Sequence, residues 1–212
     1  MKTPLSGIQL MPILRKIENR RSRMIFVLAT QTGLKYPVLC SLKVSDLMWP
    51  SGVPVECLAI RMRRNTKRHP YMRFALENVV RTAVKMYSGD WDLKQPDQFA
   101  FRRSPRRDKH ISVRHTVREI QAGIEAVTDD PALTPASAQE YFRVCVSGRL
   151  QDDAYLRRVA LGVRLPLDGP QWREVGEPAV FAAQRTAGQW LQLDEMHLFW
   201  EETKVKIRRN EL

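Results

Sequence analysis

The chain has 212 residues, 43% of them hydrophobic, which is enough for one domain with an ordinary buried core. It contains neither a run of about 18 apolar residues nor the ordered segments of a signal peptide, so we expect a cytoplasmic protein that does not enter a membrane. Its three cysteines and four histidines lack the spacing of a disulfide framework or a metal site, and we expect no metal and no other cofactor.

The formal charge of +12 is concentrated in the middle of the chain. Lys and Arg outnumber Asp and Glu by 16 to 6 over residues 58–121 and by 8 to 3 before that segment, whereas acids outnumber bases by 14 to 11 after it. Clustered cations with few acids between them are typical of a surface that binds a phosphate backbone. The distribution therefore favours a nucleic-acid partner over an ordinary solvated basic face.

The first part of the chain predicts helices packed around one buried helix. Apolar residues recur at helical spacing over 8–17 after the N-cap Ser6, which predicts a first amphipathic helix. After a basic link over 19–23, MIFVLATQTG is apolar nearly all round and predicts a central helix that ends at Gly33. A second amphipathic helix is expected from Pro37, since the missing N–H of proline costs nothing in a first turn.

The basic middle segment predicts short strands and another helix. ECLAIRM and YMRFAL alternate between apolar and polar residues on either side of the polar RRNTKRHP, and this pattern predicts a β-hairpin. A helix over 76–87 and a loop over 88–98 should follow, and Phe99 to Phe101 predict a short strand before the basic SPRRDKH. Ser112 is a good N-cap for a helix that extends to Val127.

The last third of the chain predicts mainly helices. They are expected over 137–147 and 152–161, followed by a loop over 166–170 and two helices between 177 and 209. The whole pattern indicates an α+β fold class that is mainly α-helical, with a small antiparallel β-hairpin or sheet.

The segment TGLKYPVLCSLKVSDL, residues 32–47, resembles the first box of the tyrosine recombinases, or phage integrases, in which Thr-Gly-Leu-Arg precedes a helix with Leu-x-x-Leu-x-x-x-Asp. Three further landmarks follow in the family's order: the basic hairpin Arg61 to Arg73, LTPASAQEYF in place of Pro-His-x-x-Arg, and YLRRVALGVRLPLDGPQW in place of Leu-Gly-His and the nucleophilic tyrosine. The resemblance implies a helical bundle like the family's catalytic domain over residues 1–175, without the usual N-terminal core-binding domain. Residues 176–212 would form a C-terminal helical tail.

The family cuts DNA with a tyrosine nucleophile, assisted by two arginines, a hairpin lysine and histidines. The matching positions here carry Lys35 and Gln139 for the arginines, Ala136 and Val163 for the histidines, and Trp172 for the tyrosine. Only the hairpin lysine has a counterpart, as Lys67 or Arg64. The resemblance therefore implies a recombinase scaffold whose active site has been lost.

In this family the helix after the last short strand enters the major groove of DNA, and the matching helix here is the one expected over 111–127. Its first turns carry side chains suited to contact base edges, namely Ser112, Arg114, His115 and Arg118. Cations on the hairpin and before this helix are expected to contact phosphates: Arg61, Arg63, Arg64, Lys67, Arg68, Arg102, Arg103, Arg106, Arg107 and Lys109. The alternative is an amphipathic helix with solvated arginines.

We therefore predict a catalytically inactive tyrosine-recombinase-like protein that binds double-stranded DNA, as a transcriptional regulator or an accessory factor of a plasmid, a phage or an integrative element. One alternative is an active recombinase or relaxase-like nicking enzyme with displaced residues, in which Tyr141 or Tyr155 is the nucleophile. Another is a module that binds RNA or an acidic protein. The C-terminal helices should either contact a second subunit or protein partner, or pack on the chain's own core.

Overall fold

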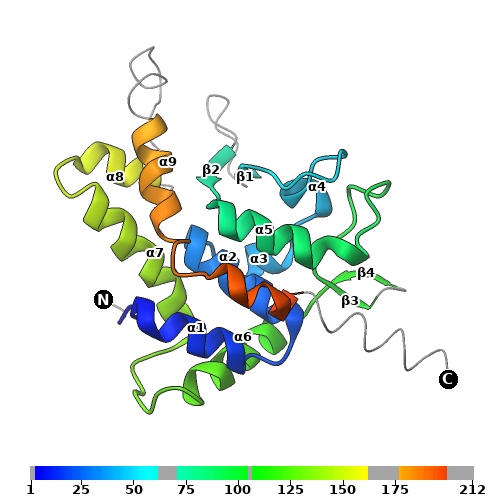
Figure 1. Cartoon of the computed structure of the whole chain (residues 1–212), viewed down its shortest axis with the longest axis horizontal. Helices are drawn as coiled ribbons and strands as arrows, with labels where there is room; N and C mark the ends of the chain where they lie inside the picture. Colours follow the sequence, from blue (N-terminus) through cyan, green and yellow to red (C-terminus); the bar gives the residue numbers. More distant parts are fainter. Residues whose placement is uncertain (1–2, 62–70, 105–106, 162–176, 200–212) are drawn as a thin grey trace.

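The computed structural model describes residues 3–61, 71–104, 107–161 and 177–199. Over these residues the chain is mainly helical with two small antiparallel sheets (Figure 1), which confirms the predicted α+β fold class. The helices are α1 (Gly7–Lys16), α2 (Arg20–Thr32), α3 (Tyr36–Cys40), α4 (Val44–Leu47), α5 (Asn78–Tyr87), α6 (Val113–Glu125), α7 (Pro135–Arg149), α8 (Ala154–Ala160) and α9 (Glu177–Thr186), with the 3-10 helices η1 (Ser88–Asp90) and η3 (Leu193–Phe199). The strands are β1 (Cys57–Arg61), β2 (Tyr71–Ala75), β3 (Arg102–Ser104) and β4 (Arg107–His110).

The core is built around α2, whose side chains are all buried from Met24 to Thr32. It contacts α1, α3, α5, α6, α7, α9 and η3, and Figure 1 shows it in the middle of the molecule. The helix begins at Arg20, because the Asn19 side chain accepts hydrogen bonds from the Arg21 and Ser22 N–H groups at 2.9 and 3.4 Å. The basic link expected over 19–23 is therefore largely the first turn of this helix.

The single helix expected from Pro37 is divided into α3 and α4. Between them, the Leu42 carbonyl accepts a hydrogen bond from the Ala100 N–H at 2.8 Å, and the Val44 N–H donates to the Gln98 carbonyl at 3.0 Å. These backbone groups would bond within a continuous helix, but here they bind the loop over 96–100. The sequence pattern did not indicate this distant partner.

The strands β1 and β2 form the predicted hairpin. They pair antiparallel, with Cys57 opposite Ala75 and Arg61 opposite Tyr71. The polar tip of the hairpin, over 62–70, lies outside the described residues.

The prediction of a strand from Phe99 to Phe101 is wrong. Phe99 forms an isolated bridge with Lys43 instead of a strand, and the Phe101 carbonyl accepts a hydrogen bond from the Ile111 N–H at 2.6 Å. Between Phe101 and Ile111, the strands β3 and β4 pair antiparallel instead, with residues 105–106 outside the described part of the chain. We call this pair of strands the β3–β4 ribbon.

The helices of the last third agree with the predicted ones in position, although α7 is longer and α8 is shorter than expected. Of the range over which two C-terminal helices were predicted, the described residues 177–199 form α9 and a short 3-10 helix, η3. Residues 200–209 and the loop expected over 166–170 lie outside the described residues. Residues 177–199 pack on the chain's own core: Arg15 pairs with Glu195, the Trp190 indole N–H donates to the Thr30 hydroxyl at 3.2 Å, and Phe199 is fully buried.

A buried carboxamide fixes α9 to the outer edge of β2. The Gln184 side chain accepts a hydrogen bond from the Ala75 N–H at 2.8 Å and donates to the Arg73 and Ala160 carbonyls at 3.1 and 3.0 Å. The neighbouring Gln31 side chain donates to the Gln184 and Ala75 carbonyls at 2.8 and 3.2 Å. Both glutamines are fully buried, so these bonds have no water to replace them.

Gln184→Ala should lower the free energy of unfolding by about 3 kcal/mol, because it leaves the buried Ala75 N–H and Ala160 carbonyl without partners and also removes the bond to the Arg73 carbonyl. Urea denaturation measures the effect. The matched control is Gln189→Ala, at an exposed position whose side chain has no hydrogen bond among the described residues, where we expect a change within about 0.5 kcal/mol. Equal losses in the two variants would contradict this role of Gln184.

Candidate nucleic-acid interface

The start of α6 presents a basic face to solvent. Ser112 is the N-cap, and its hydroxyl accepts a hydrogen bond from the His115 N–H at 3.5 Å. Thr116, Ile120, Gly123 and Ile124 are buried against the core, which leaves Arg114, His115 and Arg118 exposed on the other side of the helix. His115 lies 3.6 Å from the Glu119 carboxylate, whereas neither arginine has an ion pair within the described part of the chain.

The β3–β4 ribbon leads directly into this helix. Arg102 lies opposite His110 and Ser104 opposite Arg107, and Arg103 and Lys109 are exposed between these pairs. The Phe99 and His110 rings meet edge to face at 5.4 Å between their centroids. Ile111, which joins the ribbon to α6, is only 4% exposed. The ribbon and the start of α6 are thus held together by a buried junction.

The structure places the predicted binding residues in three groups. Arg102, Arg103, Lys109, Ser112, Arg114, His115 and Arg118 are described with their side chains, on the ribbon and the start of α6. Arg61 and Arg107 are described by their backbone alone, as strand residues. Arg63, Arg64, Lys67, Arg68 and Arg106 lie outside the described residues.

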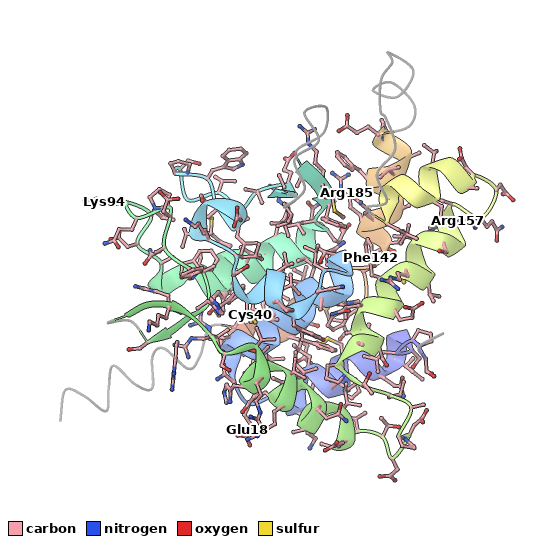
Figure 2. The ribbon with its side chains drawn as sticks, turned by 180° about the vertical axis from the view of Figure 1, so that it is seen from behind. Glu18, Cys40, Lys94, Phe142, Arg157 and Arg185 are labelled. Carbon is pink, nitrogen blue, oxygen red and sulfur yellow. The ribbon has the colours of Figure 1, made fainter. Side chains whose placement is uncertain are left out.

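The β1–β2 hairpin and α6 are on different sides of the core. In Figure 1 the two strands lie near the upper edge, α6 lies near the lower edge, and α2 and α3 lie between them. The β3–β4 ribbon, by contrast, is continuous with α6, and Figure 2 shows α6 running from the ribbon towards the loop before α7. The described basic surface is therefore made of the ribbon and the start of α6.

The ribbon is the part of this candidate surface that sequence reasoning missed. SPRRDKH has none of the β-branched or aromatic residues that usually mark strands. The only local signal is Ser104 followed by Pro105, which is common in turns, between two pairs of basic residues.

Three of the positions that match catalytic residues of the tyrosine recombinases lie in the described part of the chain, before α3 and at the start of α7. Lys35 is exposed just before α3, and Ala136 and Gln139 are half-buried in the first turns of α7. The Tyr36 hydroxyl donates to the Pro135 carbonyl at 2.7 Å, so the side chain of the residue after Lys35 contacts the backbone of the residue before Ala136. Of the remaining positions, Val163, Trp172, Lys67 and Arg64 lie outside the described residues.

The described side chains at these positions differ in charge and shape from arginine and histidine. Lys35 offers a single flexible charge instead of the planar fork that holds two phosphate oxygens, and Gln139 and Ala136 carry no charge at all.

Tyr141, one of the alternative nucleophiles, is half-buried on α7. Burial raises the pKa of its phenol well above the ordinary value, and a hydrogen bond with Cys145 adds to the rise. Tyr141 is therefore a neutral phenol near pH 7. For the other alternative, Tyr155, only the backbone is described, in α8.

Among the described residues, no group of three or more His, Cys, Asp or Glu side chains is arranged to hold a metal ion. The same residues include no helix with the length and apolar character needed to cross a membrane. A scan against protein-family models and a search of curated proteins each found no match to this chain.

The turn that positions Lys35 depends on Gly33, which has a φ of 63°. A Cβ atom at this position would lie 2.6 Å from the ring of Phe142, a buried residue of α7 labelled in Figure 2. Gly33 therefore gives both the left-handed backbone and the close approach of α7.

Gly33→Ala should destabilise the protein by about 3 kcal/mol, since the strained φ and the clash with Phe142 both oppose the native turn. Thermal and urea denaturation measure the loss. Gly148→Ala is the control: this helical glycine of α7 has open space around it, and alanine there should stabilise the protein by about 0.5 to 1 kcal/mol. A Gly33→Ala protein as stable as the wild type would contradict the inferred close contact.

Proposed function

We propose that this chain is a catalytically inactive tyrosine-recombinase-like protein that binds duplex DNA in the cytoplasm, as a transcriptional regulator or an accessory factor of a mobile element. The observation that carries the proposal is the basic surface formed by the β3–β4 ribbon and the start of α6. Arg103, Lys109, Arg114 and Arg118 are exposed there. Exposed cations on adjoining elements are suited to neutralise phosphates, and arginines on a helix can also bind base edges.

These cations differ from the arginines that stabilise the fold. Arg73 pairs with Glu177 at 3.2 Å, and Arg143 pairs with Glu140 at 3.2 Å. None of the four cations of the basic surface has such a pair within the described residues. Their charge is therefore available to an external anion.

Two observations support the loss of recombinase chemistry. Lys35, Ala136 and Gln139 stand at the arginine and histidine positions that the resemblance assigns, and the Tyr36 side chain next to Lys35 contacts the Pro135 backbone next to Ala136. The phenol of Tyr141 is kept neutral by burial and cannot replace the missing nucleophile without a base. The recombinase scaffold and the mobile-element context rest on the sequence resemblance.

The first test is selection of bound fragments from a random duplex library, at low and at near-physiological salt. We expect an enriched motif that persists at the higher salt, because base contacts depend less on counterion release than phosphate contacts do. Loss of all enrichment at higher salt would contradict a sequence-specific role. A preference for single-stranded RNA, or no salt-sensitive binding of any nucleic acid, would favour the RNA- or protein-binding alternative.

The second test addresses catalysis with a nicked suicide duplex that traps covalent protein–DNA intermediates. We expect no adduct under denaturing electrophoresis, from the wild type or from Tyr141→Phe and Tyr155→Phe variants. An active tyrosine recombinase run in parallel is the positive control for the substrate. An adduct that disappears in one of the tyrosine variants would show an active enzyme and contradict the proposal.

A further inference from the structure

The two strands of the β1–β2 sheet differ at their outer edges. On β2 the Ala75 N–H and the Arg73 carbonyl bond to the Gln184 side chain, so they point away from β1. In an antiparallel pair, two opposite residues either exchange both of their backbone bonds or turn these groups away from each other. Ala75 lies opposite Cys57, and Arg73 lies opposite Ala59. The N–H and C=O groups of Cys57 and Ala59 therefore point away from β2, towards the outer edge of β1.

A further bond gives the same orientation. The Leu76 N–H donates to the Glu56 carbonyl at 2.9 Å, one position before β1, so alternate residues from Glu56 on bond to β2 and those between them face outward. No described residue bonds to the outward N–H and C=O groups of Cys57 and Ala59. Ala59 is exposed and its side chain is small, so another chain can approach the edge there.

The position beside the strand is already filled just before β1 begins. The outward Val55 N–H donates to the Leu47 carbonyl at 3.1 Å, and an isolated bridge pairs Met48 antiparallel with Pro54. The chain before Leu47 forms α4 instead of continuing along the edge. An extended chain next to β1 would therefore continue an antiparallel position that residues 47–48 begin.

We propose that the outer edge of β1 binds an extended segment of an acidic protein, which adds to the β1–β2 sheet as an antiparallel strand. Alternating N–H donors and C=O acceptors match the backbone of an extended peptide, which supplies the same groups in the opposite order. On its core side the added strand would lie beside the half-buried Ile60, where an apolar side chain fits. This interface goes beyond the proposed function, because it is separate from the basic surface of the ribbon and α6.

The charges around the edge determine the charge of the partner. Near the start of β1 and on the neighbouring elements, charged side chains form pairs of opposite sign, namely Glu56 with Arg81, Arg73 with Glu177, and Lys43 with Asp97. The remaining acid of α4, Asp46, accepts a hydrogen bond from the Lys43 N–H at 2.7 Å. From the end of β1 onwards, the sequence over 61–70 carries five cations and no acid.

An antiparallel partner places its N-terminal end beside these cations, so acidic residues are expected at that end of the segment and apolar residues at alternate positions after it. A second copy of this chain fits the edge less well. Each chain has a formal charge of +12, and two copies would repel each other.

The first experiment tests the orientation of the edge with proline, which has no N–H to donate. Ala59→Pro removes an outward N–H and should lower the melting temperature by less than about 5 °C, whereas Ile60→Pro removes a bond to β2 and should lower it by more than about 10 °C. A loss in Ala59→Pro as large as that in Ile60→Pro would show that the Ala59 N–H is already bonded, which overturns the inference.

The second experiment measures binding of a labelled synthetic peptide, acetyl-Glu-Glu-Val-Thr-Val-Thr-Val-amide, by fluorescence anisotropy. We expect saturable binding to the wild type, and binding at least about tenfold weaker to Ala59→Pro, which loses one bond of the ladder and blocks the edge with its ring. Ala59→Val, which keeps the N–H, is the matched control and should bind within about threefold of the wild type. Lysines in place of the two glutamates should weaken binding by at least about threefold.

A peptide of the same sequence with N-methylated backbone amides should not bind, because it cannot donate to the edge. Absence of binding by the unmodified peptide overturns the inference, and so does equal binding by the wild type and Ala59→Pro or by the methylated and unmodified peptides.

Hydrogen exchange of the full chain locates the bound peptide. In the free protein the Ala59 amide should exchange at least about 100 times faster than the Ile60 amide, and the peptide should slow it by at least about tenfold. Slow exchange of Ala59 in the free protein would mean that the edge is already covered. Protection that grows with protein concentration, together with a dimer in sedimentation, would mean that a second copy occupies it. Either result overturns the inference, and neither affects DNA binding, which the duplex selection tests separately.

Discussion

The burial of α2 on every side is the constraint on which the rest of the structure depends. A helix that is apolar nearly all round has no face that can remain in water, so other elements have to cover its whole circumference. Here its neighbours in sequence, α1 and α3, cover it together with α5, α6, α7, α9 and η3, which come from distant parts of the sequence. Gly123 lets α6 approach closely, because a Cβ atom there would lie 2.8 Å from the Ile17 side chain. The face that α6 shows to solvent is therefore fixed by the core.

The sequence predicted those elements whose signals are local. A few neighbouring residues were enough to predict the apolar run of α2 and its end at Gly33, the β1–β2 pairing and the N-cap Ser112. The N-cap Asn19 was not recognised, although its signal is local as well. The failures come from partners distant in sequence. The break between α3 and α4 is set by bonds from Leu42 and Val44 to the loop over 96–100, and no pattern within residues 37–47 encodes them.

The same distinction applies to the site. The exposed arginines of α6 followed from helical spacing, but the β3–β4 ribbon did not, because its strands are made of residues that are poor strand formers on their own. The ribbon forms where the buried Phe101 and Ile111 bring the two ends of the basic segment together, with a hydrogen bond of 2.6 Å between their backbones.

The bonds of Gln184 have a consequence for the solubility of the protein. An unpaired strand edge is a template for pairing with another chain, and native proteins cover or charge such edges. Here a side-chain amide occupies the outer edge of β2 at Arg73 and Ala75, as the backbone of a neighbouring strand would. A chain cut before α9 would lose this cover and present both an open strand edge and the apolar surfaces of α2 and α7. Residues 177–199 therefore cover surfaces that would otherwise promote aggregation. A shortened form of the protein intended for crystallisation or binding studies should keep them.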